Sequence, residues 1–393
     1  MPRFPPPTPN PDEVATILVN GRQFDDWESV WVQHRYAEAW PLFRFTAAER
    51  DPLPELWTSL QFKPGDECAI YLGGILAIVG VITVRQVAYD ANSHGVQLQG
   101  KGVTWYAAEG SILDKDGNFD NQNFEQAANR VIAPFGVGVK TIGTLNPTPF
   151  ARLQVEPGEK LWDFLERIAR PRGIVMGSDH LGNFLLIGEH AAGVDDQLIE
   201  GQNILRCQCI ISVENIRSEY LVRGQTAASD EQHGSQASEQ EGKVPGSARH
   251  YSPFLTTAEQ PVWSMAEVLD RARNESIWHE GDELHAVITV QGWLRSNGDL
   301  WRVGQNVYVY SPMAMLDMVM TIQTATFTQD SGSGTLTTLE CVPPFLLRGS
   351  SDYNVAKPSV PQDPASYERA TPAAAATSVP EPPPVKIAPG AGS

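Results

Sequence analysis

Two segments of this chain, far apart in the sequence, share a pattern of glycine, tyrosine and β-branched residues. Residues 63–100 read KPGDECAIYLGGILAIVGVITVRQVAYDANSHGVQLQG, and residues 302–341 read RVGQNVYVYSPMAMLDMVMTIQTATFTQDSGSGTLTTLEC. The matched positions lie 238 or 239 residues apart: Gly65 and Gly304, Tyr71 and Tyr310, Gly95 and Gly334, and Val81–Val84 and Val319–Ile322. Any two β-hairpins share some of this pattern. A shared offset over about thirty residues nevertheless favours two related units within one chain.

Both segments lie in regions rich in strand patterns. Ser29–Tyr36 alternates apolar and polar residues, and the Asn20-Gly21 and Gly73-Gly74 pairs are typical of tight hairpin turns. Several short strands at such spacing predict a small barrel or sandwich. The fold class expected is mainly β with an α+β part: two similar small β-barrel domains, at residues 14–105 and 205–348, flank an α+β middle unit.

The middle domain, residues 106–204, mixes helix and strand patterns. Phe124–Ala133 and Glu159–Arg170 are helix-like, and each is followed or closed by a proline. A hairpin is expected around the turn Asp179–Asn183. In the second β domain, a helix over residues 264–276 is predicted from the capping box of Ser264 and Glu267.

Three segments have compositions that cannot build a hydrophobic core. Residues 1–13 form a proline-rich arm, expected to be extended. Residues 225–243 contain no apolar side chain larger than alanine, which predicts a mobile loop inserted in the second β domain. Residues 349–393 are rich in proline and alanine and predict a flexible tail.

Charge and cysteine content exclude several classes of protein. Twenty-nine basic and 47 acidic residues give a net charge of −18, which argues against a surface that grips nucleic-acid phosphates. Four scattered cysteines are too few for a disulfide scaffold, and the N-terminus lacks the apolar region of a secretory signal, so we expect folding in a reducing cytoplasm. Residues 68–84 are too short and glycine-rich for a membrane span.

Three groups of residues resemble metal sites in part. Asp114, Asp116, Asn118, Asp120 and Glu125 have the spacing of a calcium loop, but Phe119 stands where that loop needs glycine, so a polar turn is favoured. His279 and His285 are six apart and do not share a helical face, which favours a chain approaching a strand. Cys207 and Cys209 lie on one strand face and are interpreted as small buried apolar residues.

No catalytic motif stands out. The chain has no Gly-x-Ser-x-Gly elbow, P-loop or dinucleotide fingerprint, so no enzyme activity, cofactor or metal is expected. Two alternatives stay open. Paired carboxylates brought together by the fold would make a cell-wall glycan hydrolase. The ten tryptophans, if exposed in a groove, would suit a carbohydrate-binding protein for host attachment.

The order of these pieces resembles the baseplate hub protein (tail protein P) of Mu-like contractile-tail phages, which is related to hub proteins of other contractile injection systems. The likeness covers about Val14 to Arg348. It is carried by the following residues: Leu18–Gly21 with Trp27, Phe62–Asp66, Pro134–Gly136, Pro157–Glu159, Glu166–Arg170 with Gly173, Asp179–Asn183, Gly304 and Pro343-Pro344. These motifs are structural, and the family supplies no general catalytic residues to transfer.

The resemblance implies a homotrimer whose six barrels form a ring. Such a ring joins the hexameric tail tube to the trimeric central spike, contacts baseplate wedge proteins and forms part of the DNA channel. Duplication within the chain lets a threefold assembly present near-sixfold symmetry. The protein would belong to the virion tail baseplate after assembly in the host cytoplasm. Negative charge lining the channel would let DNA pass without specific binding.

Overall fold

The structure is a computed structural model that describes residues 13–25, 27–48, 62–89, 94–150, 152–188, 193–224, 240–257, 265–281 and 283–344. All of these belong to one compact unit. The predicted tail 349–393, residues 1–12 of the predicted arm, and residues 225–239 of the predicted loop lie outside the described residues.

The described part of the chain is mainly β, with a few helices. Its strands are β1 (Ala15–Val19), β2 (Arg22–Phe24), β3 (Ser29–Arg35), β4 (Leu42–Ala48), β5 (Glu67–Leu72), β6 (Ile75–Tyr89), β7 (His94–Gly102), β8 (Val139–Ile142), β9 (Val175–Ser178), β10 (Phe184–Ile187), β11 (Asp196–Ile199), β12 (Arg206–Ile211), β13 (Glu219–Gly224), β14 (Gln240–Pro245), β15 (Pro253–Thr257), β16 (Leu284–Gln291), β17 (Asn306–Ser311), β18 (Leu316–Asp330) and β19 (Gly334–Val342). Its α-helices are α1 (Trp105–Glu109), α2 (Phe124–Ile132), α3 (Leu161–Ala169) and α5 (Met265–Gly281).

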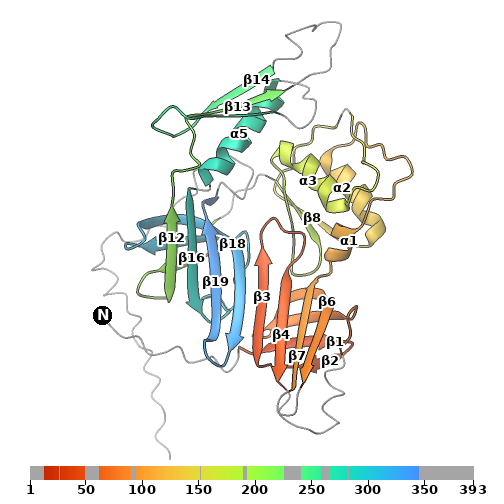
Figure 1. Ribbon diagram of the computed structural model, residues 1–393, viewed down its shortest axis with the longest axis vertical. Coiled ribbons are helices and arrows are strands. Elements are labelled where there is room, and N and C mark those ends of the chain that lie inside the picture. Colours follow the sequence, from red (N-terminus) through yellow and green to blue (C-terminus); the bar gives the residue numbers. More distant parts are fainter. Residues whose placement is uncertain are drawn as a thin grey trace, which may run out of the picture. The chain divides into compact units, whose positions relative to one another are not determined.

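One sheet of 13 described strands joins strands from both predicted β domains. Its main path runs β12-β16-β19-β18-β3-β4-β7-β6-β5-β1-β2, with β17 on β18 and β11 on β17. Figure 1 shows the part of this path from β12 to β6 as a row of strands. The two separate closed barrels expected from the sequence are not found among these ladders. The reason is that β3, from the first half, pairs with β18, from the second half.

The predicted hairpins are confirmed at their turns. Asn20 and Gly21 have φ of 50° and 76°, and the pair between β5 and β6, Gly73 and Gly74, has φ of 57° and 79°. Two successive positive φ angles suit the twist of an antiparallel hairpin, and glycine adopts them without strain. Val30 and Val32 of β3 are buried at alternate positions, as the period-two pattern of Ser29–Tyr36 predicts.

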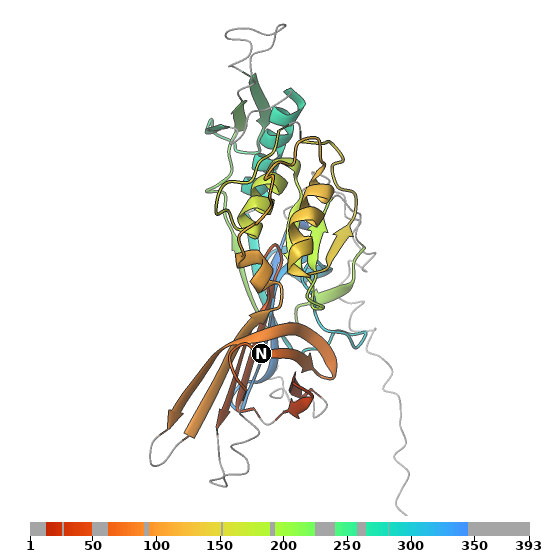
Figure 2. The ribbon, with the colours of Figure 1, turned by 90° about the vertical axis from the view of Figure 1, so that its right-hand side faces the viewer.

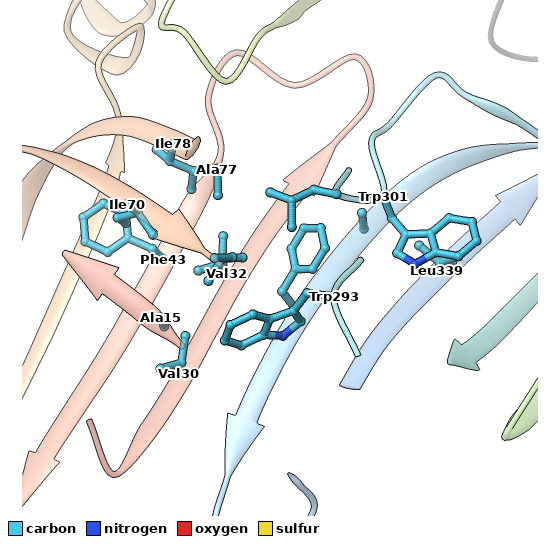
Figure 3. Close-up of a cluster of buried hydrophobic side chains, with 14 of the residues drawn as sticks. Ala15, Val30, Val32, Phe43, Ile70, Ala77, Ile78, Trp293, Trp301 and Leu339 are labelled. Atoms are coloured by element: carbon cyan, nitrogen blue, oxygen red, sulfur yellow. The ribbon is translucent and has the colours of Figure 1, made fainter. Parts of the chain in front are cut away.

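A single hydrophobic core spans both halves of the sheet. It includes Val32 and Phe43 from the first half and Ile288, Trp293 and Leu339 from the second. Figure 3 shows Trp293 lying between Val30 and Val32 on one side and Leu339 on the other. The two halves are therefore stabilised together, because burial of the same side chains supports both.

The middle unit is a small α+β structure with its own core. The three-stranded sheet β8-β10-β9 shares this core with helices α1, α2 and α3, and α3 contacts both other helices (Figure 2). The helix predicted over 159–170 is α3, and its buried face includes Leu161, Leu165 and Ile168 as expected. Asn123 and Gln126 form a capping box at the start of α2, the helix predicted over 124–133.

A second three-stranded sheet, β14-β13-β15, packs against α5 and corrects two predictions. Residues 240–243 of the predicted mobile loop form part of β14, because their backbone pairs with β13 and the next residue, Val244, packs on Val222 and Val268. The helix predicted to end at residue 276 continues to Gly281, since Ile277 is also buried. Its predicted N-cap, Ser264, lies outside the described residues.

The apolar run 68–84 lies in β5 and β6. Among the described helices, we find none with the length and apolar character needed to cross a bilayer.

Candidate functional site: the joint between two repeated sheet units

The sequence repeat corresponds to a structural repeat. Strands β5, β6 and β7 have 6, 15 and 9 residues, and β17, β18 and β19 have the same three lengths. In each unit the first part of the long strand pairs with the short strand, and the last part pairs with the nine-residue strand. A register shift falls between Ile82 and Val84 in β6 and between Ile322 and Thr324 in β18. The predicted internal duplication is present at the level of strands.

These ladders correct part of the predicted alignment. Tyr71 and Tyr310 are each the fifth residue of their strand, as predicted. Ile82 and Ile322, which flank the register shifts, are 240 residues apart, so the match of Val81–Val84 at 238 is displaced by two. Gly95 is the second residue of β7, whereas Gly334 is the first of β19. A constant offset fails because residues 312–315 form a longer turn than Gly73-Gly74.

The two units also enter their first strand in the same way. Gly65 N donates to Ile82 O, and Gly304 N donates to Ile322 O, both at 2.8 Å. The two glycines have φ of 96° and 80°, a region that favours glycine. The matching of Gly65 with Gly304 is therefore confirmed, and it marks a backbone turn that both units need.

The two units join where β3 meets the last part of β18. The strands are antiparallel, with Arg35 opposite Thr324 and Ser29 opposite Asp330. Gln33 Nε2 donates to Thr326 Oγ1 at 3.1 Å on the side away from the core. On the core side, Val32 and Phe327 face each other and are fully buried. The joint thus combines a continuous backbone ladder with apolar burial.

Trp293 and Glu13 close the joint at one end, and sequence patterns gave no sign of it. The buried Trp293 donates its backbone N–H to Glu13 Oε2 at 3.2 Å and its Nε1–H to Thr328 O at 3.3 Å. Gln329 Nε2 donates to Glu13 O at 2.8 Å. The sequence predicted that Glu13 belongs to an extended arm. The structure corrects this, because these bonds hold Glu13 in a buried position.

The sheet face away from the core carries amides and hydroxyls around the joint. Gln99 Nε2 donates to Gln97 Oε1 at 2.9 Å, and Thr289 and Thr338 hydroxyls lie 3.3 Å apart. The guanidinium of Arg44 lies over the ring of Trp31 at 5.8 Å. Glu340 lies on the same face of β19 as Thr338 and accepts from Thr324 Oγ1 at 2.8 Å. An acidic lining for a channel stays a prediction.

The calcium-like loop is held together by internal hydrogen bonds. Asp114 makes an ion pair with Arg130 at 2.7 Å and accepts from the backbone of Gly117 at 3.0 Å. Burial acts to raise the pKa of Asp114, but these bonds outweigh it and lower the pKa. Asp120 accepts from Leu153 N at 2.7 Å, and Glu125 accepts from Thr141 Oγ1 at 3.0 Å. The carboxylates that would converge on calcium are thus directed to different partners.

The two histidines are placed apart by secondary structure. His279 lies in α5, against the ring of Phe254 at 4.5 Å, and His285 lies in β16. The prediction of a chain approaching a strand is wrong for His279, since α5 continues through it. Among the described residues, no group of three or more His, Cys, Asp or Glu side chains is arranged to hold a metal.

The cysteines are thiols of the sheet. Cys207 and Cys209 lie in β12, half-buried, with Cys209 opposite Ala286 in the ladder, and both pack on the main core. Burial raises the pKa of both thiols, which keeps them protonated. The two cysteines lie on one strand face and pack on the core as predicted, but they are half-buried and not buried as expected.

Two pockets bear on the alternative functions. One lies between α3 and α5 and contains Trp162, the half-exposed Trp278 and a single carboxylate, Glu166, which pairs with Arg170 at 2.9 Å. The other contains His34, His180 and Arg302 with one carboxylate, Asp179. Neither pocket offers the two carboxylates that glycan hydrolysis uses.

Titratable groups in the second pocket are strongly influenced by burial. Burial, followed by the charge of Arg302, lowers the pKa of His34 to about 3. The same two causes lower the pKa of His180. Asp179 pairs with Lys140 at 2.6 Å. Both histidines are therefore neutral near pH 7. We interpret this pocket as part of the packing around β3.

Comparison with known protein families matches three successive parts of the chain. Residues 14–102 match the N-terminal domain of the Mu phage baseplate assembly protein GpP-like family. Residues 108–188 match the second domain of the baseplate hub protein gp44-like family, and residues 264–347 match the fourth domain of GpP. Three successive parts of the chain thus resemble domains of Mu-type baseplate hub proteins. None of these three models describes an enzyme family.

Individual relatives of the hub proteins agree with this. The baseplate hub protein gp44 of Escherichia phage Mu is 24% identical over 294 residues, covering 73% of this chain and 76% of its own length. The crystal structure of a 43 kDa tail protein of prophage MuSo2 from Shewanella oneidensis has a TM-score of 0.73, at 24% identity, and covers 85% of this chain and 99% of that one. A tail protein from Neisseria meningitidis MC58 has a TM-score of 0.70, at 18% identity, with 84% and 96% covered.

Proposed function

We propose that this chain is the structural hub of a contractile-tail baseplate and works as a homotrimer. The observation that carries the proposal is the repeat of strand lengths, register shifts and turns between β5–β7 and β17–β19. Three such chains supply six related sheet units around one axis, which matches a threefold partner on one side and a sixfold partner on the other. The domain matches support the same structural role.

The partners proposed follow from this symmetry. The sixfold side joins the tail tube or a distal tube protein, the threefold side joins the trimeric spike, and wedge proteins contact the periphery. We propose the domain division 14–105, 106–204 and 205–348 for these roles. DNA passes through the central channel without specific binding, which the net charge of −18 supports. The location is the virion baseplate, after assembly in the host cytoplasm.

Light scattering on the purified full chain tests the trimer. We expect a mass three times that of the 43.1 kDa chain. A chain that stays monomeric at micromolar concentration contradicts the proposal, because a hub must close a stable ring.

A further inference from the structure

One edge of β6 and one edge of β12 have no strand partner among the described residues. β6 pairs with β7 along one edge, and along its other edge it pairs with β5 only as far as Val81. The described ladders give β12 a single partner, β16. In the joint, β18 is the counterpart of β6, and β3 is the counterpart of β12. The corresponding edges of β18 and β3 are not open, because these two strands pair with each other. The two open edges are thus the two halves of a joint of the kind seen inside the chain.

Rows of cross-strand partners show that β12 is the counterpart of β3. In the first unit, the row that starts at the bulge runs Ile82, Gly100, Phe43, Val32. In the second unit it runs Ile322, Cys341, Ala286, Cys209. Val32 therefore corresponds to Cys209, and the same counting along β6 and β18 makes Val87 the counterpart of Phe327.

Exposed apolar side chains gather on these two edges. Val84 and Val87 of β6 are 45% and 44% exposed, and Ile210 and Ile211 of β12 are 54% and 47% exposed. In the joint, the counterpart of Val87, Phe327, is 2% exposed. Open strand edges with apolar side chains favour pairing with another strand. Each of the two edges therefore suits a partner strand that carries apolar side chains. Strand β6 is such a partner for β12, and β12 is such a partner for β6.

We propose that β6 of one copy pairs with β12 of the next, in antiparallel register, and so repeats the β18–β3 joint between chains. Transferring the register of the joint places Val87 opposite Cys209 and Ala88 opposite Gln208 of the neighbouring chain. The contact is head-to-tail, and such contacts close a ring when the rotation between successive copies returns to the first copy, as the trimer requires. This inference rests on the proposed function for the number of copies, three, and adds the strands and residues that join them.

A single substitution tests the register, because one partner is a natural cysteine. Directly opposed residues of antiparallel strands have Cα atoms about 4.5–5.5 Å apart, within the range of a disulfide. We expect the full-length Val87→Cys variant, oxidised with copper phenanthroline at pH 8.5, to run as a covalent trimer on a non-reducing gel. The alkaline pH offsets the raised pKa of Cys209. Reduction should return the single-chain band.

Two variants control for chance encounters and for misfolding. Adding Cys209→Ser to Val87→Cys should abolish the covalent trimer, and Ala88→Cys alone should give none, because residue 88 lies on the other sheet face. The pair Ala88→Cys with Gln208→Cys gives a second test on that face and should also cross-link. A trimer by light scattering that neither pair cross-links overturns the strand pairing and leaves the hub proposal standing. A monomeric wild-type chain overturns both.

Discussion

Trp293 illustrates how one side chain holds the two repeats together. It fills the core between them, donates its backbone N–H to Glu13 of the first half and donates its Nε1–H to Thr328 O of β18 at the joint. We expect Trp293→Ala to lower the free energy of unfolding by about 3–5 kcal/mol, the range for a buried aromatic residue. Trp278→Ala, at a half-exposed tryptophan, is the matched control and should cost less than about 1 kcal/mol. Urea unfolding followed by far-UV circular dichroism measures both, and equal effects would contradict the account.

His34 gives a pH dependence at the same scale. Its pKa is about 3 when folded and about 6.5 when unfolded, so the unfolded chain binds more protons between these values. Stability therefore rises with pH through this window and is lost as pH falls below about 6.5. Between pH 6.5 and 4.5 the contribution is at most about 3 kcal/mol. We expect His34→Gln to reduce the fall in melting temperature between these pH values, and an unchanged fall would refute the assignment.

At the scale of elements, the strands were predictable and their partners were not. Period-two burial and glycine turns identified β3, β5 and β6, because these signals are local. The pairing of β3 with β18 joins residues about 290 positions apart and depends on edges that only the folded chain creates. The same holds for β14, whose polar residues 240–243 are ordered by their neighbour strand. The contact between Trp293 and Glu13 could not be predicted for the same reason, because it also forms between distant parts of the folded chain.

The exposed edge of β12 leads to a prediction about assembly at this scale. Ile210→Asp places a charge within the proposed contact between chains, where pairing with the next chain would remove part of the water around the carboxylate. We expect the variant to weaken association at least tenfold while the melting temperature of the single chain changes little. Leu255→Asp is the matched control, because Leu255 of β15 has nearly the same exposure, 53% against 54%, and lies on another sheet. Sedimentation velocity over a concentration series measures both, and dissociation by the control alone would contradict the contact.

At the scale of the whole molecule, the duplication explains how a structural role suits this chain. The features that the two units share are turns, bulges and strand lengths, which set the geometry of a sheet. The repeat and the family resemblance could be predicted from the sequence. The joint could not, because it forms only when the strand edge of one folded unit pairs with that of the other.

Electron microscopy of the purified full-length chain tests the central claim most directly. Class averages viewed along the symmetry axis should show three chains as six similar lobes around an open centre, since each chain contributes two related units. Averages with three lobes, or particles without a central opening, would contradict the account, because the two sheet units would then not occupy equivalent places in one ring.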